Sequence, residues 1–85
     1  MTEVVLHPGR YLAAELEKRS MSYAVAAELL DLTQSHISFL CNCRRAVTWP
    51  VAKKLAEHFE RSASFWMEQQ EAWEKQQFQP VKEGQ

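Results

Sequence analysis

The chain has 85 residues, which is enough for one domain with a modest helical core. No apolar run approaches the length of a membrane span and no secretory signal pattern opens the chain, so we expect a cytoplasmic protein with no membrane partner. The formal net charge of −1 excludes overall basicity as a source of affinity for nucleic acid, which leaves only a local basic patch to supply it.

The residue types that carry catalytic or metal chemistry are few and scattered. Cys41 and Cys43 are one residue apart, too close to staple a fold by a disulfide and not spaced as a zinc pair. We interpret them as packing or incidental thiols rather than a redox or metal switch. The histidines are dispersed, at His7, His36 and His58, and no nucleophile–base set or Gly-rich phosphate loop is recognisable. The sequence therefore predicts no enzyme, no metal and no cofactor.

The first predicted helix follows an extended arm over residues 1–7. Pro8 suits the first turn of a helix, because its missing N–H would have no partner there. The helix is expected to run to about Arg19, with apolar and charged side chains on opposite sides. The inward residues are Tyr11, Leu12 and Leu16, and the outward residues are Glu15, Glu17 and Lys18.

Residues 22–45 contain two short helical patterns, separated by a turn too short for an antiparallel hairpin. Ser22 and Thr33 can cap the two helices by accepting from free backbone N–H groups. Ala26 and Ala27 are small enough to let two helix backbones cross closely. The apolar stripe expected to face the core is Ala26, Ala27, Leu30, Leu32, Ile37 and Leu40. This pattern is typical of a helix-turn-helix, whose second helix lies in the DNA major groove.

The outward side of the second helix favours DNA over plain solvation. It carries short or planar hydrogen-bonding side chains suited to base edges, where a merely solvated face would more often hold Glu and Lys. These residues are Gln34, Ser35, His36 and Ser38. Arg44 and Arg45 follow directly and form a compact basic patch that a dimer would double. The alternative left open is an ordinary helical hairpin inside another small bundle.

Two further helices are predicted after this stretch. Thr48 is expected to cap the fourth, with Pro50 in its first turn, and Ser62 is expected to cap the fifth. The fourth helix has a broad apolar face at Val51, Ala52, Leu55, Ala56 and Phe59. From about Lys75 the chain is polar and Gln-rich, which we interpret as a frayed helix end and a polar tail.

Aromatic residues near the carboxyl end predict a dimer contact. Trp66, Trp73 and Phe78 exceed what one small core readily absorbs, and an uncovered aromatic stripe usually marks a protein interface. Trp66 and Trp73 are seven residues apart and so share a helix face. For Trp66 the alternative remains open that it fills the bundle beneath the fourth helix.

With these elements laid out, the chain resembles the HigA family of antitoxins, which carry an Xre/Cro-type helix-turn-helix. The resemblance covers residues 7–74. Besides the helix-turn-helix, which many repressors share, it rests on three more specific blocks. These are His7-Pro8-Gly9, Ala46-Val47-Thr48, and Phe65-Trp66-Met67 followed by Gln70, similar to a Phe-Trp-Leu-x-x-Gln block of the family.

The resemblance implies an all-α, compact five-helix bundle with a lambda-repressor-like helix-turn-helix. Residues 1–7 would be an arm, 8–75 the DNA-binding domain with a dimerisation helix, and 76–85 a tail. The implied protein is a homodimer that binds palindromic operator DNA and represses its own operon. It also neutralises, by direct binding, a co-encoded RelE-type toxin, an RNase that cleaves mRNA. The implied DNA-binding residues are Ser22, Tyr23, Thr33, Gln34, Ser35, His36, Ser38, Phe39, Arg44 and Arg45.

Four residues depart from the family pattern. Tyr23 stands where a Gln often reaches a phosphate, and Asp31 occupies a turn position usually held by Gly. Cys43 replaces the Gly that commonly ends the recognition helix, where a left-handed backbone costs other residues about 1 kcal/mol. Phe39 lies at an often polar position, where its ring would contact a thymine methyl group or a protein partner.

Two alternative functions follow from these departures and from the near-neutral charge. One is a helix-turn-helix that serves as a protein-interaction module and has lost DNA binding. The other is a stand-alone repressor with no toxin partner. A short basic reading frame beside this one would favour the antitoxin over both.

Overall fold

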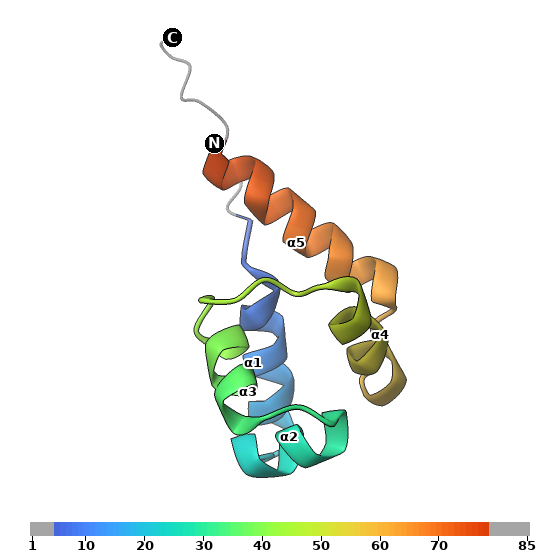
Figure 1. The fold of residues 1–85 in the computed structure, drawn as a ribbon. Helices are drawn as coiled ribbons and strands as arrows, with labels where there is room; N and C mark the ends of the chain where they lie inside the picture. The colour runs from blue at the N-terminus through green and yellow to red at the C-terminus, as the bar shows by residue number, and fades with distance from the viewer. Residues whose placement is uncertain (1–4, 79–85) are drawn as a thin grey trace, which may run out of the picture.

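Five helices follow one another along residues 5–78, the part of the chain that the computed structural model describes, apart from the side chain of Phe78. They are α1 (Pro8–Lys18), α2 (Tyr23–Leu30), α3 (Gln34–Cys41), α4 (Trp49–His58) and α5 (Ala63–Phe78) (Figure 1). Every regular element in this range is a helix, so the predicted all-α five-helix fold is confirmed. None of these helices is long and apolar enough to cross a bilayer.

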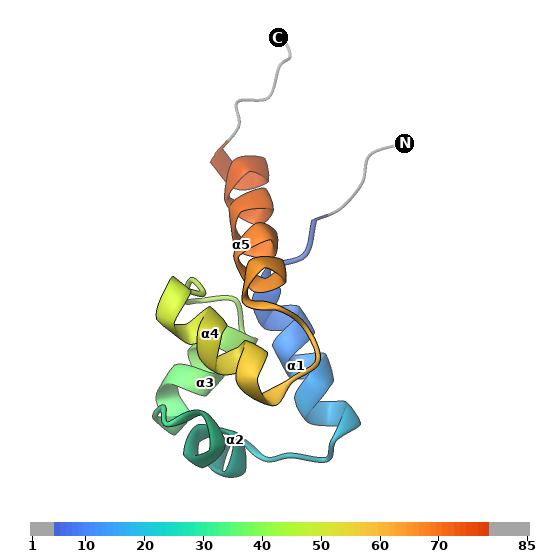
Figure 2. The same ribbon diagram turned by 90° about the vertical axis from the view of Figure 1, so that its right-hand side faces the viewer.

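Helix α5 differs from the others in reaching well past the bundle. Its first half packs against α4 and α1, while α3 packs alongside α1 and α2 lies at the opposite end of the molecule (Figure 1, Figure 2). Its second half rises beside the segment that leads into α1, where the backbone N–H of Val5 donates to Gln76 Oε1 at 3.4 Å. Helix α5 continues to Phe78.

The helix starts lie where the sequence predicts them. Ser22, Thr33 and Ser62 each accept, through the side-chain hydroxyl, the backbone N–H three residues further on, at 3.0–3.1 Å. Thr48 also stands at the N-cap position of α4, but its side chain makes no capping hydrogen bond. Three of the four predicted caps are thus made by the expected atoms.

Each residue of the His7-Pro8-Gly9 segment has a separate structural role at the start of α1. His7 Nδ1 accepts the backbone N–H of Gly9 at 2.8 Å and so caps α1, while Pro8 occupies the first turn. A Cβ atom on Gly9 would overlap the backbone carbonyl oxygen of Leu40, because α1 and α3 meet backbone to backbone at this point. Glycine is required here by close approach and not by its dihedral angles.

The core forms where the apolar stripes of the helices meet. Ala26 and Ala27 are buried at the crossing of the helix-turn-helix, as predicted, whereas Leu32 is only partly buried against the core. The buried apolar residues are Leu12, Leu16, Ala26, Ala27, Leu30, Ile37, Leu40, Cys41, Val47, Val51, Ala52, Leu55, Phe59 and Trp66. Apart from Leu32, the apolar stripe of the helix-turn-helix is therefore part of the buried core, as expected.

Trp66 corrects one prediction. Its side chain is 0% exposed within a single chain, so it has no surface to offer a partner, and the prediction that it joins a dimer contact is wrong. The alternative, that it fills the bundle, is the arrangement observed. Trp73 is only partly buried and its ring lies edge-on to His7, with centroids 4.8 Å apart. The predicted contact of Phe78 falls on a side chain outside the described residues.

Glu15 is a second correction, because it was expected to face solvent and is buried. Its carboxylate accepts from Arg19 Nε at 3.1 Å, one turn further along the chain. Arg19 also lies over the ring of Phe59, 5.0 Å from its centroid. A buried carboxylate is tolerated at position 15 because the guanidinium group of Arg19 pairs with it. Helical periodicity alone does not reveal such a pairing.

Candidate nucleic-acid interface

Helix α3 presents its polar side outward. Gln34, Ser35 and Phe39 are exposed, and His36 and Ser38 are partly exposed, so the predicted base-facing positions share one accessible side. The opposite side of the helix is buried in the core, at Ile37, Leu40 and Cys41. Figure 1 shows α3 at the surface of the bundle, where it packs against α1 and α2. The arrangement leaves the outward side free to meet a large ligand.

Arg44 and Arg45 are exposed directly after this helix. The backbone N–H of Arg44 donates to the carbonyl of Phe39 at 2.8 Å, which folds the chain back onto the end of α3. The guanidinium of Arg45 lies 5.9 Å from the centroid of the Phe39 ring, within the range of a cation–π contact. Phe39, 45% exposed, therefore supports the basic pair as well as extending the surface of α3.

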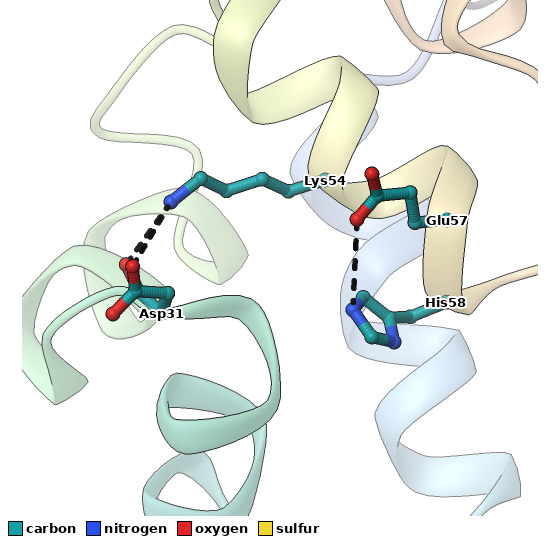
Figure 3. Close-up of polar contacts among 4 residues, drawn as sticks. All are labelled: Asp31, Lys54, Glu57 and His58. Carbon is teal, nitrogen blue, oxygen red and sulfur yellow. Dashed lines mark hydrogen bonds and ion pairs between the residues drawn. The ribbon is translucent and has the colours of Figure 1, made fainter.

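A third cation joins this surface from α4. The pKa of His36 is lowered, first by burial and then by the positive charges of Arg45 and Lys54. Lys54 Nζ donates to the backbone carbonyl of Asp31 at 3.1 Å and lies 4.0 Å from its carboxylate (Figure 3). Lys54 does not stand out in the sequence, because its place at the turn before α3 arises only when α4 packs against α2.

Figure 3 also shows His58 beside Glu57, with 3.9 Å between Nε2 and the carboxylate. This contact joins two neighbouring residues of α4, and we assign it no part in binding. Within residues 5–78, no three His, Cys, Asp or Glu side chains are placed to hold a metal ion.

Tyr23 is less available than the sequence suggests. Tyr23 is 41% exposed, but its hydroxyl lies close enough to the thiol of Cys41 for the two groups to interact. The pKa of Tyr23 is raised mainly by the charge that Cys41 carries when ionised, and burial raises the pKa of Cys41 itself. The hydroxyls of Ser22 and Thr33 are likewise engaged as caps. A phosphate at these helix starts would meet backbone N–H groups first.

Two buried polar side chains hold the segment that follows α3. Gln70 accepts the backbone N–H of Val47 through Oε1 at 2.8 Å and donates through Nε2 to Glu74 at 2.9 Å. Burial lowers the pKa of His7, and it outweighs the opposing influence of the Arg45 backbone and of the negative charge of Glu74. Only the resemblance drew attention to His7 and Gln70, and their partners lie 38 and 23 residues away in the sequence.

Solved structures of two antitoxins share this architecture, although no family model matches the chain. An addiction module antidote protein of the HigA family from Coxiella burnetii is 29% identical, with a TM-score of 0.81 over 88% of this chain and 83% of that one. The Pseudomonas aeruginosa antitoxin HigA, solved with the higBA promoter, is 27% identical, with a TM-score of 0.82 over 87% of this chain and 82% of that one. These neighbours confirm the resemblance to the HigA family and the helix-turn-helix fold.

One curated protein gives a match in sequence. The chain is 39% identical over 66 residues to virulence-associated protein A of Dichelobacter nodosus. The match takes in 75% of this chain and spans 65% of the length of that relative.

Proposed function

We propose that this chain is a HigA-type antitoxin that binds operator DNA as a homodimer and represses its own operon. The observation that carries the proposal is the outward polar side of α3, with Arg44 and Arg45 exposed directly after it and Lys54 bound to Asp31 at the turn before it. A structural neighbour with a TM-score of 0.82 was solved with the higBA promoter, which supports DNA binding by this chain. The local cluster supplies the positive charge that the whole chain, at −1, lacks.

In the proposed complex, contacts divide between phosphates and base edges. Backbone N–H groups at the starts of α2 and α3, with Arg44 and Arg45, hold phosphates and set the position of the domain without reading sequence. Gln34 reaches a base edge, where a bidentate pair with adenine is worth about 1–3 kcal/mol of discrimination. Two copies of α3 in the dimer would lie about 34 Å apart, one turn of the duplex.

His36 suits base reading better than phosphate binding. Because its pKa is lowered from the ordinary value of 6.5, the imidazole is neutral at physiological pH and offers one donor and one acceptor. A neutral ring between two cations adds no charge for a phosphate but can pair with a base edge. The DNA mechanism therefore gives His36 a role distinct from that of Arg45.

The DNA part of the proposal is tested by titrating the promoter region of the chain's own reading frame at several salt concentrations. Arg44→Ala is expected to weaken binding to all sequences and to lower the salt slope by about 1 per subunit. Gln34→Ala is expected to relax sequence preference with little change in the slope. Lys18→Ala, an exposed cation at the far end of α1, is the matched control and should change neither.

If the effects of Arg44→Ala and Gln34→Ala on affinity and sequence preference were reversed, the roles assigned to these two residues would be refuted. If Arg44→Ala changed sequence preference while leaving overall affinity and salt slope intact, Arg44 would not be a phosphate contact. If no duplex from the promoter region were bound above non-specific level, DNA binding itself would be refuted.

The antitoxin part of the proposal is that the chain neutralises a co-encoded RNase toxin of the RelE type by direct contact. It is supported by the resemblance to the HigA family and by the two antitoxin structures. Co-expression with the adjacent reading frame should rescue growth from that frame's toxicity, and the two products should purify together. Lack of rescue and of a complex would favour the stand-alone repressor.

For the dimer, we propose a contact through the exposed part of Trp73 and through Phe78, both on the half of α5 that leaves the bundle. Sedimentation should then give a dimer at tens of micromolar, and Trp73→Ala should shift the chain toward monomer. A monomer of the unaltered chain at that concentration would contradict the contact.

A specific observation favours a second candidate, a helix-turn-helix used for protein contact. Val25 and Leu29 lie one turn apart on α2 and are 52% and 39% exposed, and Phe39 of α3 is also exposed. Exposed apolar side chains of this kind suit a protein partner better than a phosphate backbone. The DNA titration separates the two candidates, because this second one predicts no promoter binding.

A further inference from the structure

We infer that His7 and Gln70 are positioning residues for DNA binding: Gln70, hydrogen-bonded to the Val47 backbone, and His7, which lies against the Arg45 backbone, fix the segment 44–47, and with it the guanidinium groups of Arg44 and Arg45. This inference rests on the proposed function, because it assigns to the two residues a part in presenting the basic pair to phosphates. We call residues 44–47 the basic loop. It connects the recognition helix α3 to α4 and belongs to no helix itself.

Gln70 holds the carboxyl end of the basic loop. Its side chain is 3% exposed, and both ends of the amide are used, with Val47 N–H donating to Oε1 at 2.8 Å and Nε2 donating to Glu74 at 2.9 Å. Only the amide oxygen can accept from Val47, and only the amide nitrogen can donate to Glu74. The two bonds together therefore fix which way the amide faces. The Val47 side chain is buried as well, so this end of the loop is held by backbone and side chain together.

His7 holds the middle of the basic loop. Its Nδ1 accepts from Gly9 at 2.8 Å, so in the neutral ring the proton lies on the other nitrogen, and the ring lies against the backbone of Arg45. Trp73 packs edge-on against the ring, 4.8 Å between centroids. The tautomer, the orientation of the ring and its burial are thus all fixed before DNA arrives.

The two guanidinium groups depend on this backbone support. Arg44 and Arg45 are exposed, and within residues 5–78 neither forms an ion pair with an acidic side chain. Their charges are therefore free for phosphates, but each long side chain must be ordered when it binds. A rigid backbone beneath them lowers the ordering cost, because fewer dihedral angles have to be fixed in the complex. We therefore expect His7 and Gln70 to act on affinity through Arg44 and Arg45.

Two variants remove the bonds while preserving the packing as far as the chemistry permits. Gln70→Met keeps the length of the side chain but cannot accept from Val47. His7→Asn keeps an oxygen that can cap α1 but is too short to reach Arg45. Gln69→Met, a partly exposed neighbour on α5, is the matched control. Promoter binding is measured for each at a temperature where circular dichroism shows the chain to be folded.

The expected result is a coupling that depends on the arginines. Gln70→Met and His7→Asn should each weaken promoter binding about fivefold and lower the salt slope, while Gln69→Met should do neither. In a background carrying Arg44→Ala and Arg45→Ala, the same two changes should have less than a twofold effect. A role in stability alone would weaken binding by the same factor in both backgrounds, and that result would overturn the inference.

Hydrogen exchange tests the support directly in the unaltered chain, whether or not a variant folds. The Val47 amide should exchange as slowly as the buried amides of α5, because its partner Gln70 is held in that helix. Exchange at the rate of an unprotected loop amide would overturn the inference. If the chain bound no promoter DNA, the proposed function would fail, and the Val47 exchange rate would still decide whether the loop is held.

Discussion

At the scale of single residues, three positions adopt a backbone conformation that costs free energy of folding. Ser20, Asp31 and Cys43 all adopt left-handed backbone angles, with φ of 53°, 57° and 62°. This conformation is unfavourable for residues with a Cβ atom, by about 1–2 kcal/mol. Asp31 is partly compensated because its backbone carbonyl accepts from Lys54. The structure identifies no role for the Cys43 side chain, so at this position nothing offsets the cost of the left-handed backbone.

We therefore predict that Cys43→Gly stabilises the domain. Glycine removes the steric penalty but adds freedom to the unfolded chain, so the net gain should be about 0.5–1 kcal/mol in the free energy of unfolding. Urea denaturation followed by circular dichroism measures this difference. Cys43→Ala, which keeps the Cβ atom, is the control and should bring no such gain; equal stabilisation by both would contradict the explanation.

His7 predicts a second residue-level effect, on the pH dependence of stability. Its pKa is lowered from 6.5, chiefly by burial, so below pH 6.5 the unfolded chain binds more protons than the folded one. Stability from this group is complete above pH 6.5 and should fall as the pH drops from there toward the lowered pKa. Urea unfolding at pH 7.5 and 5.5 measures the loss.

The variant His7→Asn separates this effect from other titrating groups. Asparagine has no proton to gain in this range, so the variant should lose less stability than the unaltered chain between pH 7.5 and 5.5. His36, whose pKa is also lowered, still contributes to the remainder. An identical pH dependence in the two proteins would show that His7 is not the buried titrating group described.

At the scale of helices, the placement of α1 against α3 depends on Gly9. A side chain there would overlap the backbone carbonyl of Leu40, and backbone cannot move aside as a flexible side chain can. Gly9→Ala is therefore expected to destabilise the domain by about 2 kcal/mol or more, despite the better helix propensity of alanine. Thermal unfolding measures the change, with Ala14→Ser on the exposed side of α1 as the control. A gain in stability in Gly9→Ala would refute the close approach.

The helices also show which features a sequence can predict. The caps at Ser22, Thr33 and Ser62 were predictable because each bond joins residues three apart. The same holds for the outward side of α3, which follows from helical periodicity. Trp66 was assigned to a dimer contact because its aromatic character is equally consistent with a core and an interface. Only the packing of α5 on the bundle decided between them.

The long-range polar contacts in the candidate site could not be predicted from the sequence, for a different reason. Gln70 contacts Val47, and Lys54 contacts Asp31, each across 23 residues. Neither residue stands out in its own helix, where both types are common on solvated faces. Their roles come from tertiary packing, which brings an α4 lysine to the recognition helix and an α5 glutamine to the basic loop.

At the scale of the whole molecule, the proposed function depends on where charge is placed rather than on its total. A chain with 10 basic and 11 acidic residues has Arg44 and Arg45 exposed directly after α3, and Lys54 at the turn before it. The outward side of α3 carries Gln34 and His36, so in the proposed complex the phosphate contacts would surround the base contacts. The other helices bury the inner side of α3, and in the proposed mechanism His7 and Gln70 hold the basic loop.

If the outward side of α3 enters DNA, NMR titration of the labelled chain with its promoter duplex will show it in the amide signals of that helix. We expect the largest amide shift changes on residues 33–39 and 44–45, and far smaller changes in the second half of α5. Changes confined to the exposed apolar residues of α2, or an absence of changes in residues 33–39 at saturating duplex, would contradict it.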